Sequence, residues 1–191
     1  MLELSMHVLD IAENSVAAAA TLVEIRIREN FKEDILTIDV TDNGRGMARE
    51  AAMRATDPFF TSRTTREVGL GLPLLKAAAE RCGGSMAVQS APGKGTKVTA
   101  RFGLDHVDRA PLGDMADTIA VLITGNADID FLYEHEVDGK SYRLATKEMR
   151  EILDPVRLDD PRVHSFIRED VDKGLKAIGA ATFPKMMEAL K

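Results

Sequence analysis

Two polar side chains on the first predicted helix could serve one ligand together. Asp10 and Asn14 are four residues apart, so a helix over residues 2–19 places them one turn apart on the same face. That face presents a carboxylate and an amide oxygen, and an amide oxygen is a hard ligand that suits Mg²⁺. Glu13 lies beside them and competes for any role given to Asp10, whereas His7 is expected at the surface or as a cap. A solvated polar stripe is the alternative for this pair taken alone.

A glycine-containing turn after a predicted strand is the second group of candidate residues. Apolar residues alternate along residues 35–40, and the segment TDNGRGM follows at residues 41–47. If Asp42 is buried, its carboxylate can accept a hydrogen bond from an exocyclic amine and so select adenine. Gly44 and Gly46 have no Cβ and let a flat ligand approach the backbone. An ordinary strand-to-helix turn is the alternative, because Asx-Gly pairs are common there.

A glycine-rich helix start is the third feature, and it could bind an anion. The run Gly69-Leu70-Gly71-Leu72 opens a predicted helix that ends near residue 81. Free backbone N–H groups and the positive end of the helix dipole attract anions at such a start. The preceding polar segment DPFFTSRTTR, residues 57–66, could fold over phosphates as a lid. A surface loop anchored by one of its phenylalanines is the alternative.

These groups need a scaffold of strands and helices, which hydrophobic spacing predicts. In the first half of the chain the predicted strands are 22–29, 35–40, 85–90 and 96–102, and a short helix covers 48–55. The first two strands are expected to pair as an antiparallel hairpin, since only a polar, turn-like segment separates them. The turn APGKG joins the last two.

Residues 105–191 contain no catalytic constellation, but their pattern predicts further helices and a hairpin. The predicted elements are a helix with Pro111 in its first turn that ends at Gly125-Asn126, strands 129–137 and 140–145, a short helix to Leu153 capped by Thr146, and a helix from Asp160-Pro161 to near Gly179. The dipeptide Asp138-Gly139 is a strong hairpin turn and sets Glu134 opposite Arg143. Covering the sheet, homodimerising or docking a partner are the plainest roles for this half.

Length and composition limit the kind of protein. The chain has 191 residues, of which 45% are apolar and 29% charged, as in ordinary globular domains that bury a core. The formal net charge of -6 argues against an extended nucleic-acid surface. The single cysteine, Cys82, cannot form an internal disulfide, and no apolar run is long enough to span a membrane. We therefore expect a soluble, cytoplasmic protein that binds neither nucleic acid nor a membrane.

Five segments, taken in order, resemble a known superfamily. They are the helix that carries Asn14 and the segments DNGRGM, DPFFTSR, GLGLPLLKAAAERCGG and SAPGKGT. Over residues 1–104 their order and spacing resemble the histidine-kinase-like ATPase superfamily, the GHKL or Bergerat-fold group. The resemblance implies an α+β fold, a two-layer α/β sandwich in which helices cover a mixed, mainly antiparallel sheet. We expect residues 1–104 to form the ATP-binding domain and residues 105–191 an extension with a β-hairpin and helices.

The resemblance also implies a Mg-ATP site. Asn14 would ligate the Mg²⁺ that bridges the phosphates, and Asp42 would bind the adenine amine, with the following glycines making room for the ring. Thr96 would help to hold the adenine, and either Arg63 or Arg66 would reach the γ-phosphate. The implied nucleotide-binding residues are Asn14, Asp42, Gly44, Gly46, Phe60, Arg63, Gly69, Leu70, Gly71, Leu72 and Thr96.

The residue four positions before Asn14 decides the chemistry that the resemblance implies. Hydrolysing members and the serine kinases commonly have a glutamate there, which orients and deprotonates an attacking water or hydroxyl. This chain has Asp10, whose carboxylate is one methylene shorter and could act as the base directly or through a water; Glu13 is the reserve candidate. Two functions follow. One is an ATPase or protein kinase in bacterial regulation, acting on a partner's Ser, Thr or His, and the alternative is an ATP-dependent binding switch with little turnover.

Two departures from the sensor-kinase pattern indicate a free-standing module. No helical hairpin with a phospho-accepting histidine precedes Asn14, and the lid before Gly69 is short, with Glu67 where those kinases usually have glycine. Free-standing proteins of this general look occur in anaerobic bacteria near genes for hydrogenase or NADH-oxidising complexes. We therefore expect an unidentified protein partner, which this resemblance links to a redox or hydrogenase complex. A homodimer stays open.

Overall fold

The computed structural model describes residues 3–56 and 71–180, which form six strands and six helices. In chain order these are α1 (Leu4–Ala17), β1 (Leu22–Asn30), β2 (Ile35–Asp42), α2 (Arg49–Arg54), α3 (Gly71–Arg81), β3 (Ser85–Ser90), β4 (Thr96–Gly103), α4 (Met115–Gly125), β5 (Asp130–Val137), β6 (Lys140–Ala145), α5 (Thr146–Leu153) and α6 (Pro161–Ile178). The predicted strands and helices are therefore confirmed, with shifts of a few residues at their ends.

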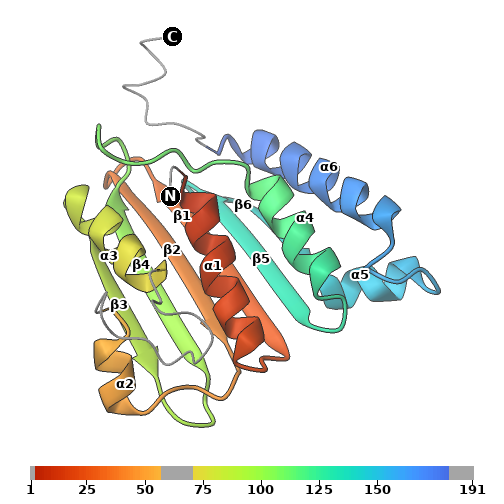
Figure 1. Ribbon diagram of the computed structural model, residues 1–191. Helices are drawn as coiled ribbons and strands as arrows, with labels where there is room; N and C mark the ends of the chain where they lie inside the picture. Colours follow the sequence, from red (N-terminus) through yellow and green to blue (C-terminus); the bar gives the residue numbers. More distant parts are fainter. Residues whose placement is uncertain (1–2, 57–70, 181–191) are drawn as a thin grey trace.

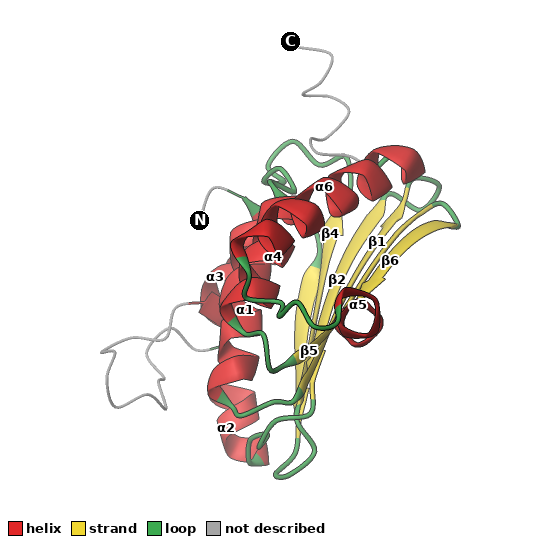
Figure 2. Cartoon of the chain, turned by 90° about the vertical axis from the view of Figure 1, so that its right-hand side faces the viewer, coloured by secondary structure: helices red, strands yellow, loops and turns green. Residues whose placement is uncertain are grey.

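The strands form one sheet in the order β3-β4-β2-β1-β5-β6. Strands β1 and β5 run parallel, and the other neighbouring pairs are antiparallel. Figures 1 and 2 show α1, α3, α4 and α6 on the same face of this sheet. The predicted mixed, mainly antiparallel sheet covered by helices is confirmed. The β5–β6 hairpin also has the predicted register, with Glu134 opposite Arg143.

Alternation along β1 explains why the helices gather on one face. Val23, Ile25 and Ile27 point toward the helices and are at most 1% exposed. Full burial of each such side chain stabilises the fold by roughly 1.5–3 kcal/mol. The intervening residues carry charges to the opposite face, where Arg28 Nη2 lies 2.5 Å from Asp39 Oδ2 of β2. This side of the sheet is polar and needs no helix to cover it.

A buried polar cluster joins the two halves of the chain within the sheet. His135 of β5 is fully buried, and its Nε2 lies 2.7 Å from Glu29 Oε1 of the neighbouring strand β1. Its Nδ1 lies 2.9 Å from the hydroxyl oxygen of Tyr133. Burial raises the pKa of Tyr133 well above its ordinary value, so this hydroxyl keeps its proton. These hydrogen bonds satisfy polar groups that would otherwise be costly in the core.

Two predicted helix starts in the second half were wrong. The helix α4 begins at Met115 rather than near Pro111, because the Asp114 side chain caps it by accepting a hydrogen bond from the Asp117 backbone N–H at 2.8 Å. Thr146 is the first residue of α5 and not its cap. Its hydroxyl instead accepts a hydrogen bond from the backbone N–H of Phe131 at 2.8 Å, which ties α5 to β5.

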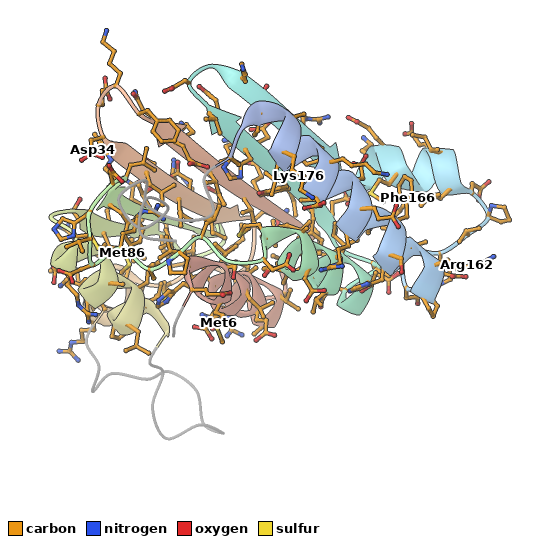
Figure 3. The ribbon with its side chains drawn as sticks, turned by 90° about the horizontal axis from the view of Figure 1, so that it is seen from above. Met6, Asp34, Met86, Arg162, Phe166 and Lys176 are labelled. Carbon is orange, nitrogen blue, oxygen red and sulfur yellow. The ribbon has the colours of Figure 1, made fainter. Side chains whose placement is uncertain are left out.

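The last helix, α6, has the predicted ends. The Asp160 side chain accepts a hydrogen bond from the Arg162 backbone N–H at the start, and Gly179 adopts a left-handed φ of 76° at the end. Figure 3 shows Arg162 at the beginning of this helix and Lys176 near its end. No helix in the described ranges, α6 included, is long and apolar enough to cross a lipid bilayer.

His7 of α1 was expected at the surface or as a cap, and this prediction was wrong. The side chain is only 4% exposed, and its Nδ1 has no hydrogen-bond partner among the described residues. Burial lowers the pKa of His7 from 6.5 to about 4. The imidazole is therefore neutral near neutral pH, because protonation inside the core would cost desolvation free energy.

We expect His7 to make the free energy of unfolding depend on pH. The folded-state pKa is depressed, so its contribution is fully present above pH 6.5 and is lost as the pH falls toward about 4. The loss should amount to about 3 kcal/mol. Urea unfolding across this range, compared between the wild type and His7→Leu, measures it. If both proteins lose the same free energy of unfolding, His7 is not responsible.

Candidate functional site

Asp42 is the centre of the predicted adenine site, at the end of β2. Its side chain is buried, and Oδ1 accepts hydrogen bonds from the backbone N–H groups of Gly44 at 2.8 Å and Thr96 at 3.2 Å. Oδ2 accepts a hydrogen bond from the Ser15 hydroxyl at 2.8 Å. A carboxylate has about four acceptor positions. Among the described residues these contacts leave one position on Oδ2, where an exocyclic amine can donate.

Strand pairing brings Thr96 to this carboxylate. Asp42 and Thr96 are register partners in the antiparallel pair β2–β4, so residues far apart in sequence meet at the same end of the sheet. The Thr96 hydroxyl lies 2.9 Å from the hydroxyl of Ser90, the last residue of β3. Ser90 also accepts a hydrogen bond from the Met47 backbone N–H at 2.8 Å. Thr96 is therefore held both by its strand and by the turn that follows Asp42.

The two turns around Asp42 pack so closely that they require glycine. Gly46 has a φ of +64°, and a Cβ there would lie 2.0 Å from the Ala91 carbonyl oxygen. Gly95 has a φ of +75°, and a Cβ there would lie 1.8 Å from the carbonyl oxygen of Asp42. Both positions combine a left-handed backbone with a contact that no side chain could make. Glycine is therefore required at position 46 for the packing of the two turns, in addition to any room that it makes for a ligand.

Gly44 is needed for a different contact. A Cβ on Gly44 would lie 2.8 Å from the carbonyl oxygen of Ala18, just after α1. The Arg45 backbone N–H donates to the same oxygen at 2.9 Å. The turn therefore rests on the end of α1, and this contact keeps α1 and β2 in the relation that lets Ser15 reach Asp42.

The predicted catalytic carboxylate lies where α1 meets the start of α3. Asp10 and Asn14 are half-buried, whereas Glu13 is exposed. A Cβ on Gly71, the first residue of α3, would lie 1.5 Å from Asp10 Oδ2, so the carboxylate packs directly on this glycine. A negative charge is favoured at a helix N-terminus. The structure thus brings Asp10 to the helix start predicted to face phosphates.

The remaining predicted binding residues are Leu72, at the start of α3, and four residues that precede this helix. Leu72 is partly buried and packs against the hydrophobic core at the start of α3. Four further predictions lie outside the described residues: Phe60, Arg63, Gly69 and Leu70. The predicted lid and its alternative arginine, Arg66, lie there too.

The side chains near Asn14 suit a Mg²⁺ ion that is bound mainly by phosphate oxygens and water and only in small part by the protein. No group of three or more His, Cys, Asp or Glu residues that could hold a metal occurs in residues 3–56 and 71–180. Mg²⁺ usually keeps several waters and is held by one or two protein oxygens together with phosphates. The Asn14 amide, half-buried on the same face of α1 as Asp10, can supply such an oxygen.

Two serines were missed as site residues. Neither Ser15 nor Ser90 was assigned a role in the site from the sequence. Ser15 contacts Asp42, which lies 27 residues later, so no local motif marks this contact, whereas Ser90 is the first residue of the segment SAPGKGT and contacts Gly95 and Thr96 within the same hairpin. The available signal for Ser15 was its position directly after Asn14, which puts a hydroxyl beside the predicted metal ligand.

The helix-covered mixed sheet, with a buried aspartate between two glycine turns, is the arrangement expected of a histidine-kinase-like ATPase domain. Comparison with known proteins agrees: residues 2–106, more than half of the chain, match the family described as histidine kinase-, DNA gyrase B-, and HSP90-like ATPase. The chain belongs to this family, whose domains bind ATP, usually with Mg²⁺. The predicted superfamily is confirmed.

The chain is also similar to parts of two longer bacterial proteins. It is 33% identical over 97 residues to the non-motile and phage-resistance protein of Caulobacter vibrioides, covering 48% of this chain and 12% of that protein. It is 36% identical over 105 residues to the sensor protein kinase FleS of Pseudomonas aeruginosa, covering 55% of this chain and 25% of that protein. The chain thus spans at most 25% of the length of these two relatives.

A solved structure shares the fold beyond the matched family region. It is the N-terminal domain of a DNA repair protein, with a TM-score of 0.54 and 18% sequence identity. The match covers 76% of this chain and 53% of that one. At this identity the similarity concerns the fold alone, and it agrees with the α+β architecture of the sheet and its helices.

Proposed function

We propose that the chain is a Mg-ATP-dependent enzyme of bacterial regulation, either an ATPase or a kinase that phosphorylates a partner protein. The observation that carries this proposal is the Asp10 carboxylate packed on Gly71, the first residue of α3. A carboxylate in that place would lie beside phosphates bound at the helix start. This is where a group must lie to act on an attacking water or hydroxyl.

Each proposed role follows from the position of the residue. Asp42 accepts the adenine amine, and the N-terminus of α3 attracts the phosphates. Asn14 holds Mg²⁺, which when bound neutralises charge on the phosphate oxygens. Asp10 orients the attacking oxygen and accepts its proton. Gly46 and Gly95 let the two turns beside Asp42 pack closely against each other.

A binding switch is the second candidate, and the length of Asp10 favours it. Aspartate reaches one methylene less far than glutamate, so it acts on a nucleophile less directly. In this case the protein binds ATP, changes its affinity for a partner and hydrolyses little. Its nucleotide site is the same, so only the fate of the γ-phosphate separates the two functions.

Incubation with γ-labelled ATP and Mg²⁺, with and without proteins from the native host, tests these functions. Label on a partner protein indicates a kinase, and free labelled phosphate indicates an ATPase. Neither product, together with tight ATP binding, indicates a switch. If the purified protein has no affinity for ATP in the presence of Mg²⁺, all of these functions are excluded.

We expect Asn14→Ala to remove the effect of Mg²⁺ on ATP affinity. In the wild type, chelating Mg²⁺ should weaken binding by about tenfold, since a hydrogen bond or metal contact to a charged group is worth about 1.5 kcal/mol. Titration calorimetry with and without EDTA measures this in both proteins. Asn30→Ala is a matched control, because Asn30 lies at the other end of β1 from Val23, the register partner of Asp42. A Mg²⁺ effect that persists in Asn14→Ala would exclude Asn14 as the ligand.

A further inference from the structure

Ser15 binds Oδ2 of Asp42, the carboxylate oxygen that the backbone N–H groups of Gly44 and Thr96 do not contact. Its side chain is 3% exposed, and its hydroxyl lies 2.8 Å from Asp42 Oδ2 and 3.3 Å from the carbonyl oxygen of Ile11. One hydroxyl has one proton to donate, and the shorter bond to a charged acceptor is the stronger. Ser15 thus donates to Oδ2 and occupies one of its two acceptor positions.

Ser90, at the end of β3, holds Thr96 of the neighbouring strand β4. Its hydroxyl accepts from the Met47 backbone N–H at 2.8 Å and lies 2.9 Å from both the Gly95 carbonyl oxygen and the Thr96 hydroxyl. The Thr96 backbone N–H in turn donates to Asp42 Oδ1. A continuous chain of hydrogen bonds therefore runs from Ser15 through Asp42 and Thr96 to Ser90 and the turn at Met47.

This chain fixes the pattern of donors and acceptors that a purine would meet. A carboxylate bound by three donors cannot rotate, and its remaining acceptor position on Oδ2 has one direction. Adenine places an amine donor at C6, whereas guanine places a carbonyl acceptor there, which a fixed carboxylate rejects. A site that leaves a buried polar group unpaired discriminates strongly against the wrong ligand. Freeing the carboxylate would weaken this discrimination.

We propose that Ser15 and Ser90 are positioning residues that make the site selective for adenine over guanine nucleotides. The inference rests on the proposed ATP site and adds two residues to it. Ser15 orients the acceptor on Asp42, and Ser90 fixes Thr96 and the spacing between the two turns.

The test is a set of titrations with ATP and GTP analogues. In Ser15→Ala and in Ser90→Ala we expect the ratio of the GTP to the ATP dissociation constant to fall by roughly tenfold, the effect of one hydrogen bond in a charged network. Ser15→Thr and Ser90→Thr keep the hydroxyl and should retain the wild-type ratio. Ser5→Ala is the matched control, since Ser5 is also buried on α1 but lies near Glu3 instead of Asp42.

The outcomes separate this inference from the proposed function. A wild type that binds no ATP contradicts the ATP site itself. A wild type that binds ATP, with alanine variants that weaken both nucleotides equally, contradicts only the role of the serines in selectivity. Lower thermal stability with an unchanged ratio does the same, because a purely structural serine would change stability and leave discrimination intact.

Discussion

Asp42→Asn is expected to weaken ATP binding by roughly a hundredfold while the protein stays folded. The amide keeps one oxygen for the Gly44 and Thr96 backbone N–H groups, which now contact Oδ1 at 2.8 and 3.2 Å. It replaces the acceptor Oδ2 by an NH₂ group, which faces the adenine amine with a second donor. Titration calorimetry with a non-hydrolysable ATP analogue, together with a thermal melt, measures both effects.

Asp39→Asn is the matched control for this result. Asp39 lies three residues earlier on β2, is buried, and makes its contacts with Arg28 and Thr99. It belongs to the face of the sheet opposite the helices, so its change should leave ATP affinity as it is. Retained ATP affinity in Asp42→Asn would show that adenine is recognised elsewhere, and the proposed site would have to be abandoned.

Asp10→Asn is expected to lower turnover by roughly a hundredfold, the lower end of what a general base contributes. ATP binding should persist or tighten, because a negative charge leaves the region of the phosphates. Phosphate release under single-turnover conditions and calorimetry give the two quantities separately. Asp117→Asn removes a carboxylate from the first turn of α4 and serves as the control. Loss of turnover in Glu13→Gln, with none in Asp10→Asn, would assign the role to Glu13.

Gly71 supplies an independent check on the position of Asp10. A Cβ on this glycine would lie 1.5 Å from Asp10 Oδ2, so Gly71→Ala should displace the carboxylate and lower turnover in the same way. In an Asp10→Ala background the added methyl meets no carboxylate, and Gly71→Ala should then cost little. Such non-additivity is the signature of two groups in contact. Additive losses would mean that the two residues act separately.

The parts of the site that the sequence predicted are those with local signals. Gly46 adopts a left-handed backbone, and the segment DNGRGM alone is enough to predict a turn with such a residue. The alternation of apolar residues likewise predicts the strand β1, and Asp138-Gly139 predicts the hairpin of the residues on either side of it. The confirmed strands, helices and hairpin register all rest on such short-range patterns.

The parts that were missed depend on contacts between distant segments. Ser15 meets Asp42 only because α1 packs on β2, and Ser90 accepts a hydrogen bond from the backbone N–H of Met47, which lies 43 residues earlier. His7 was expected at the surface or as a cap because histidine is usually at least partly exposed, yet it lies three residues after Leu4 and four before Ile11 on the buried face of α1. Pro111 suits a first helical turn, yet the cap of Asp114 decided where α4 begins.

The parallel pairing of β1 with β5 has a consequence for any shortened form of the protein. Residues 130–137 supply the hydrogen bonds along one side of β1. A fragment ending near residue 104 would keep the nucleotide site but turn β1 into an edge strand, with a row of unpaired amides flanked by Val23, Ile25 and Ile27. Exposed edges of this kind recruit other strands and promote aggregation. We therefore expect a fragment that ends near residue 104 to aggregate more readily than the whole chain, because β5 no longer pairs with β1.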